Sequence, residues 1–140
     1  MVAMGAVDGD LRDNLVQVSF AVIAVLSRVA AEQDLSLTQL RMLGILRDRE
    51  PTMAELATYL GLERSTVSGL IDRAVQRGLV QKNTHPADGR SVRVSLTPQA
   101  RRLESGIIAA IGELTVPLTG RLSASEQKRL TDLLAKVLAR

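Results

Sequence analysis

Two short helical patterns joined by a tight glycine turn restrict the fold of this chain more than any other feature. The first pattern covers residues 53–60 and ends at Gly61, and the second covers residues 64–77 and ends at Gly78. The apolar positions at helical spacing are Leu56, Ala57 and Leu60 in the first pattern and Val67, Leu70, Ile71 and Ala74 in the second. Helices of this length are marginal on their own in water, so both are expected to pack against one shared core.

A β-hairpin is expected directly after the second helix. Residues 79–82 form a short strand-like run, and residues 91–96 alternate apolar and polar side chains. Between them, residues 83–90 are rich in turn-forming residues. Strand, loop and strand therefore predict a hairpin packed beside the two helices.

Capping signals place the remaining helices. A Ser or Thr followed three residues later by Glu or Gln is the signature of a capping box, and it occurs at Ser36 with Gln39, Thr52 with Glu55, and Ser123 with Glu126. The Thr-Pro pair at 97–98 opens a long helix that is expected to be interrupted at Pro117 and Gly120. Helical spacing also begins at Leu11, after a loose arm over residues 1–9. The chain is thus predicted to be mostly α with a small β-hairpin.

The first helix carries apolar side chains on more than one face. One stripe holds Leu11, Leu15, Val18 and Val22, and a second stripe holds Val16, Phe20, Ile23 and Ala30. A helix with two apolar faces must be covered on both. In so short a chain a partner subunit is the expected cover, and a central helix in a monomeric bundle is the alternative.

Basic side chains are concentrated in one part of the sequence. The 140 residues have a formal net charge of +3, but residues 64–93 alone hold six basic and two acidic residues, or +4, which leaves −1 elsewhere. A local basic patch is expected of a surface that meets phosphates, although an ordinary solvated face can have the same composition.

Composition argues against several classes of function. The chain has no cysteine, which excludes disulfides, thiolate metal sites and thiol-based sensing. His85 is the only histidine, so we expect no zinc site, no cofactor and no enzymatic activity. Two aromatic residues, Phe20 and Tyr59, are too few for stacking on single-stranded nucleic acid.

The longest apolar run, residues 20–26, is too short to span a bilayer, and no basic leader precedes it. A cytoplasmic protein without membrane contact is therefore expected.

The outward face of the 64–77 helix is small, polar and partly basic. Opposite its apolar side lie Ser65, Gly69, Asp72 and Gln76, flanked by Ser68 and Arg73. Thr66 joins Ser65 in the first turn, where hydroxyls and backbone N–H groups suit a phosphate. A short helix, a tight turn and a helix with such a face predict a helix-turn-helix, whose second helix is expected to read base edges in the major groove. The alternative is an ordinary surface helix, since a polar outer face is common.

The expected hairpin supports that interpretation. Arg90 lies near its tip, where an arginine inserted into the minor groove gains from the concentrated negative potential. Asp88 would hold the Arg90 guanidinium by a bidentate pair, and the alternative is an ordinary surface ion pair.

The residues from Leu35 to Thr97 resemble the multiple antibiotic resistance regulator (MarR) family of winged helix-turn-helix transcription factors. The matching stretches are Met53-Ala54-Glu55-Leu56-Ala57, Ser65-Thr66-Val67-Ser68, Ile71-Asp72-Arg73, Arg77-Gly78-Leu79-Val80, Asp88-Gly89-Arg90 and Val94-Ser95-Leu96-Thr97. Each stretch is weak alone, but their order and spacing together are specific. The resemblance extends over nearly the whole chain after residue 10.

This resemblance implies a division of the chain and a set of functional residues. Residues 35–97 would form the winged helix-turn-helix DNA-binding lobe, and residues 10–34 and 98–140 a helical dimerisation region. The residues that it places on the DNA-reading helix are Arg64, Ser65, Thr66, Ser68, Gly69 and Arg73, with Arg90 as the minor-groove arginine of the wing and Asp88 as its support. The residues expected at the dimer interface are Leu11, Leu15, Val18, Val22, Leu130, Leu134 and Val137. Two departures matter, because Gly69 and Gly89 stand where some members carry arginines that hold DNA.

The resulting prediction is a homodimeric repressor that binds an inverted-repeat operator in double-stranded DNA. The resemblance also implies release of DNA by a small aromatic or phenolic ligand. The alternative is a winged-helix module that binds another protein and does not bind DNA.

Overall fold

The computed structural model describes residues 2–84 and 91–139, with side chains from residue 9 onward. The described residues form six helices and a two-stranded antiparallel hairpin, as the sequence predicts. In chain order these are α1 (Val2–Glu32), α2 (Leu37–Ile45), α3 (Met53–Leu60), α4 (Arg64–Gln76), β1 (Val80–Thr84), β2 (Val92–Leu96), α5 (Pro98–Thr119) and α6 (Ala124–Val137).

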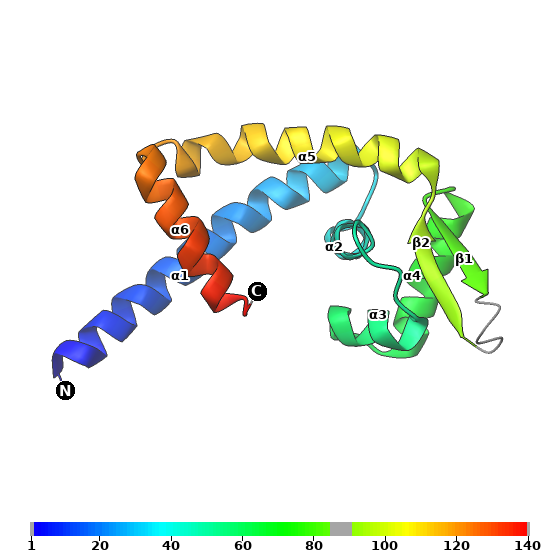
Figure 1. Cartoon of the computed structure of the whole chain (residues 1–140), viewed down its shortest axis with the longest axis horizontal. Coiled ribbons are helices and arrows are strands. Elements are labelled where there is room, and N and C mark those ends of the chain that lie inside the picture. The colour runs from blue at the N-terminus through cyan, green and yellow to red at the C-terminus, as the bar shows by residue number, and fades with distance from the viewer. Residues whose placement is uncertain (1, 85–90, 140) are drawn as a thin grey trace.

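The elements form a lobe and a helical arm (Figure 1). The lobe consists of α2, α3, α4 and the hairpin. The arm consists of α1 and α5, which pack together beside the lobe and diverge away from it, and of α6, which turns back from the far end of α5 at 111°.

One core lies inside the lobe and extends into the near end of the arm. Its largest fully buried side chains come from every part of the lobe: Met42, Leu46, Leu56, Val67, Ile71, Val80 and Val94. Val29 and Ala30 of α1 and Ala100 and Ile107 of α5 complete it. The arm is therefore anchored to the lobe through buried apolar contacts at this end only.

The hairpin is attached to the lobe by backbone hydrogen bonds. Its strands pair from Val80 opposite Leu96 to Thr84 opposite Val92. The outer side of β2 continues this pairing, because the Val94 amide donates to the Pro51 carbonyl at 2.9 Å and Thr52 bridges Arg93. The middle and the loop-side half of β2 are thus tied to the start of α3.

Two of the three predicted capping boxes are confirmed. Ser36 with Gln39 and Ser123 with Glu126 each make both reciprocal bonds, and the two hydrogen bonds from Ser123 lower the pKa of Glu126. At the start of α3, Thr52 accepts from the Glu55 amide, but its hydroxyl donates to the Glu55 carboxylate at 3.2 Å. The third site is therefore a simple cap, because the Glu55 carboxylate is directed to the Thr52 hydroxyl and the Arg93 guanidinium and not to the Thr52 backbone amide.

Two expectations about the arm differ from the structure. Helix α1 begins at Val2, so the residues expected as a loose arm over 1–9 are helical from residue 2 onward. A helix that is already nucleated extends at little cost through residues such as Ala3 and Ala6, even without an apolar stripe. Helix α5 also continues through Pro117 to Thr119. Pro117 removes only one backbone donor, the one that would reach the Glu113 carbonyl, and it lies in the last turn of α5.

The arm exposes large apolar side chains in the single chain. Six of the seven predicted interface residues are exposed and Val22 is half-buried, and the most exposed are Leu11 at 65% and Val137 at 70%. Helix α6 has no buried residue among those described. By length and composition alone, Gly9–Glu32 would suffice to cross a membrane, and only 11% of this apolar stretch is buried. The exposed apolar faces of α1 and α6 must therefore be buried by contacts from outside the single chain.

Candidate nucleic-acid interface

A tight turn at Gly61 sets the angle between α3 and α4. Gly61 has φ 66° and ψ 32°, the left-handed conformation that favours glycine, and its amide donates to the Ala57 and Thr58 carbonyls. The Leu62 amide donates to Ala57 as well, at 3.1 Å. The chain therefore leaves α3 sharply and enters α4 after two further residues, which is the predicted helix-turn-helix geometry.

The inward face of α4 is sealed and its opposite face is open. Val67 and Ile71 are fully buried, and Leu70 and Ala74 are nearly so. The predicted DNA-reading residues lie elsewhere on the helix, where Arg64, Ser65, Thr66 and Arg73 are exposed and Ser68 and Gly69 are half-buried. The structure thus brings these six residues together on one uncovered surface.

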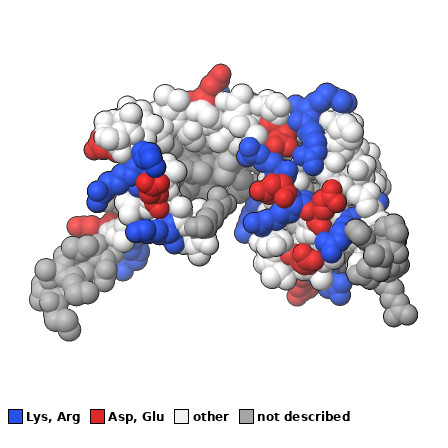
Figure 2. Space-filling model, viewed as in Figure 1, with Lys and Arg blue, Asp and Glu red and all other residues white. Residues whose placement is uncertain are grey.

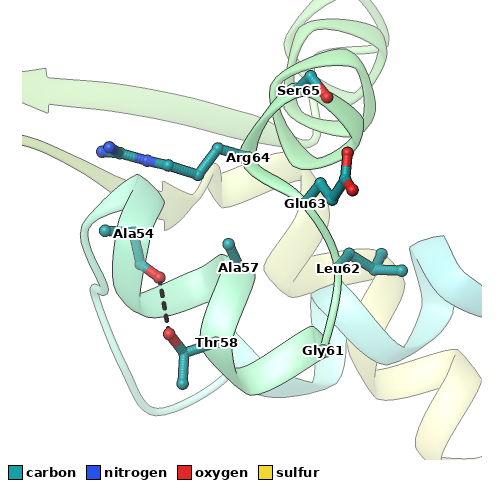
Figure 3. A pocket seen from close by; sticks show the side chains of 8 residues that line it. All are labelled: Ala54, Ala57, Thr58, Gly61, Leu62, Glu63, Arg64 and Ser65. Atoms are coloured by element: carbon teal, nitrogen blue, oxygen red, sulfur yellow. Dashed lines mark hydrogen bonds between the residues drawn. The ribbon is translucent and has the colours of Figure 1, made fainter.

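The first turn of α4 borders a shallow open hollow against α3 (Figure 3). Apart from one leucine, its lining is small or polar: Ala54, Ala57, Thr58, Gly61, Leu62, Glu63, Arg64 and Ser65. The Arg64 side chain extends over α3 (Figure 3). The Glu63 carboxylate points in a different direction, away from Arg64. Within the described residues, the Glu63 side chain makes no capping hydrogen bond to α4. The early backbone N–H groups of this helix are therefore available to an anion.

Gly69 and Arg73 lie one helical turn apart on the exposed side of α4. A Cβ atom at position 69 would lie 3.4 Å from the Arg73 Nη1 atom. The Arg73 guanidinium thus folds back over the glycine. The lack of a side chain at position 69, beside an arginine, allows close approach to base edges.

Three of the six basic residues in the basic segment are paired with other groups of the protein. The Lys82 ammonium lies 3.1 Å from the Asp72 carboxylate, which links β1 to α4. Arg93 donates to the Glu50 carbonyl at 3.0 Å, and Arg77 donates to the Gln33 and Asp34 carbonyls. Sequence reasoning counted all three as part of a phosphate-binding patch. It missed these partners because most of them are backbone carbonyls far away in the sequence, and no side-chain pattern marks them.

Arg64 and Arg73 are the basic side chains of this segment that have no protein partner among the described residues. The lobe face seen in Figure 2 shows Lys and Arg interspersed with Asp and Glu. Local geometry, more than net charge, therefore distinguishes the α4 surface.

The predicted wing residues Asp88 and Arg90 lie outside the described residues. The strands that lead to them are firmly held, because the side-chain Nδ2 of Asn83 donates to the buried Ser95 hydroxyl at 2.8 Å across the hairpin. The described base of the hairpin packs directly beside α4.

Comparison with known proteins gives a consistent result. The profile of the MarR family matches residues 33–91. The HTH-type transcriptional repressor NicR of Pseudomonas putida is 30% identical over 116 residues, which cover 82% of this chain and 73% of that protein.

Solved structures agree with this match. The apo form of wild-type MarR from E. coli superposes with a TM-score of 0.76 at 28% identity, over 91% of this chain and 96% of that chain. A mutant MarR from E. coli in complex with operator DNA superposes with a TM-score of 0.71 at 27% identity, over 92% and 94% of the two chains.

Proposed function

This chain belongs to the MarR family, and from that premise we propose that it is a homodimeric transcriptional repressor that binds an inverted-repeat operator in double-stranded DNA. The members named above support this proposal, since one is called a transcriptional repressor and another is bound to operator DNA. Regulators of this family act through binding, so we propose no enzymatic activity, no cofactor and a cytoplasmic location.

The observation that carries the proposal is the two-sided character of α4. Its inner side is sealed in the core by Val67 and Ile71. Its outer side carries hydroxyls, a glycine and two arginines that have no protein partner within the part of the chain that the structure describes. A helix held this rigidly, with an uncovered polar face and a hairpin beside it, suits insertion into a major groove.

We propose distinct roles for the residues of this surface. Ser65, Thr66 and the open amides of the first turn would bind a phosphate, and Arg64 would assist them. Ser68, Gly69 and Arg73 would face base edges. Arg90, supported by Asp88, would enter the minor groove from the wing.

We propose residues 35–97 as the DNA-binding lobe and residues 10–34 and 98–140 as the dimerisation region. The exposed apolar faces of α1 and α6 support this division, since a second copy of the chain would bury both. A partner subunit rather than a membrane is then the cover of α1.

Release of DNA by a small aromatic or phenolic ligand is also proposed, and it rests on the family resemblance alone. Titration of the operator complex with a panel of aromatic and phenolic carboxylates tests it. A ligand that weakens operator binding without unfolding the protein supports the proposal, and a panel without effect speaks against it.

Salt-dependent DNA binding tests the central proposal. The operator is first selected from genomic fragments, and its affinity is then measured from 50 to 200 mM salt. If six to ten phosphates are neutralised per dimer, affinity falls by roughly 10³–10⁵ over this range. A shallow dependence on both operator and random duplex DNA would favour the protein-binding alternative.

Substitution of Arg73 locates the interface. Arg73→Gln is expected to weaken operator binding by roughly 10- to 100-fold, because a base-edge or phosphate contact is lost in each protomer. Arg102→Gln is the matched control, since Arg102 is exposed on α5, away from the α4 surface, and the charge change is identical. If the two substitutions weaken operator affinity equally, α4 does not lie at the DNA interface.

A further inference from the structure

The C-termini of α1 and α4 meet at one arginine side chain. Arg77 is the C-cap residue of α4, and its guanidinium reaches the loop that follows α1. Its Nη1 atom donates to the Asp34 carbonyl at 2.7 Å, and its Nη2 atom donates to the Gln33 carbonyl at 2.9 Å. Two charge-assisted bonds from one planar group fix both distance and orientation.

The loop after α1 presents these two carbonyls because of its backbone conformation. Asp34 has φ 55°, a left-handed value that is unfavourable for most residues other than glycine. The Leu35 amide donates to Ala30 and the Asp34 amide to Ala31, the bond pattern of a Schellman helix end. The carbonyls of residues 33 and 34 then lie beyond the last turn, at the negative end of the helix dipole, where a cation is favoured.

The same end of α4 is also fastened to α5. The Thr97 hydroxyl donates to the Gly78 carbonyl at 2.6 Å while it caps α5, and the Thr97 amide donates to Leu79. The C-terminus of α4 is thus tied to both long helices of the arm, to α5 through Thr97 and to α1 through Arg77.

We propose that Arg77 is a positioning residue for DNA binding: it sets the direction of α4 relative to α1 without itself touching DNA. This inference rests on the proposed function, in which α1 forms part of the dimer interface and α4 enters the groove. In a two-fold dimer, the direction of α4 relative to α1 determines the distance between the two reading helices. Arg77 therefore contributes to the half-site spacing that the dimer accepts.

The geometric consequence can be measured without DNA. The chain has no cysteine, so Thr66→Cys places one spin label per protomer at the far end of α4, where a change of direction has most effect. Double electron–electron resonance is expected to give a broader distribution of label-to-label distances with Arg77→Gln than with Arg77. The width for Arg77→Lys should be intermediate, since lysine keeps the positive charge but cannot donate to both carbonyls from one planar group. Distributions of equal width in all three proteins would overturn the proposal.

The functional consequence separates positioning from direct contact. Arg77→Gln is expected to weaken binding to an operator of native spacing roughly tenfold, because preorganisation is lost. It should leave the salt dependence unchanged and reduce the penalty for adding one base pair between half-sites. Arg73→Gln should instead make the salt dependence shallower. A shallower salt dependence for Arg77→Gln, or unchanged affinity, would overturn the proposal.

Two controls keep the outcomes distinct. Thermal unfolding and light scattering establish that each Arg77 variant is folded and has the oligomeric state of the unsubstituted chain. The unsubstituted chain is tested first, and its failure to dimerise or to bind DNA contradicts the proposed function. If it does both and the Arg77 variants behave identically, only the positioning role is rejected.

Discussion

At Gly69, helix stability and the proposed contact with DNA favour different residues. Glycine inside a helix costs about 1 kcal/mol relative to alanine. The space at this position would accept a methyl group, since it would meet the Arg73 guanidinium at an ordinary contact distance of 3.4 Å. Packing therefore does not require glycine here. A requirement for close approach to DNA would explain it.

The substitution Gly69→Ala tests this explanation, because two measurements should change in opposite directions. The free energy of unfolding is expected to rise by about 1 kcal/mol, while operator affinity falls roughly five- to tenfold as the methyl group is pressed against base edges. Urea unfolding and operator titration measure the two effects. Higher stability with unchanged affinity would mean that DNA does not approach position 69 closely.

At the scale of elements, a single serine caps the N-terminus of α6. Ser123 accepts from the Glu126 amide at 3.2 Å, and the Glu126 carboxylate accepts from the Ser123 amide at 2.9 Å. The hydrogen bonds that the Ser123 backbone amide and then its side chain make to the Glu126 carboxylate lower the pKa of Glu126 below its ordinary value of 4.5. Because the folded-state pKa is the lower one, this contribution to stability is present above pH 4.5 and is lost as the pH falls through the folded-state value.

Ser123→Ala is expected to lower the free energy of unfolding by about 1 kcal/mol at pH 7. Only the part of this difference that comes from the Ser123 side chain acting on the Glu126 carboxylate should disappear on acidification below pH 4.5, because the backbone amide of residue 123 and its hydrogen bond remain in the alanine variant. Urea unfolding between pH 7 and pH 3 measures it. Ser105→Ala, within α5, makes the same chemical change without a cap and should be neutral or slightly stabilising; a loss of stability there as large as that of Ser123→Ala would argue against the cap.

Elements determined by local chemistry were predictable from the sequence, and contacts between distant segments were not. The caps at Ser36 and Ser123, the turn at Gly61 and the buried side of α4 each follow from residues within one or two turns of each other. The engagement of Arg77 depends instead on carbonyls 43 and 44 residues away. The start of α1 at Val2 was missed because helix extension leaves no apolar period to detect.

At the scale of the whole molecule, the lobe and the far part of the arm depend on different sources of stability. The lobe closes its own core, to which the near ends of α1 and α5 contribute. The far part of the arm does not, since Leu15 is 52% exposed and Leu134 is 43% exposed in the single chain. A charge placed on the far arm should therefore disturb association and leave the lobe folded.

Leu134→Asp makes this separation measurable. A carboxylate in an apolar interface is strongly unfavourable, so the variant is expected to be monomeric by light scattering. Its circular dichroism should retain the helical signal of the lobe. A monomer engages one half-site at a time, so operator affinity should fall by roughly 10²–10⁴ as the linkage between half-sites is lost. Ser125→Asp adds the same charge on the polar face of α6, beside Lys128 and Arg129, and should remain dimeric. A dimeric Leu134→Asp protein with intact operator binding would mean that α6 lies outside the interface, and another surface of the arm would then have to hold the two reading helices at a fixed distance.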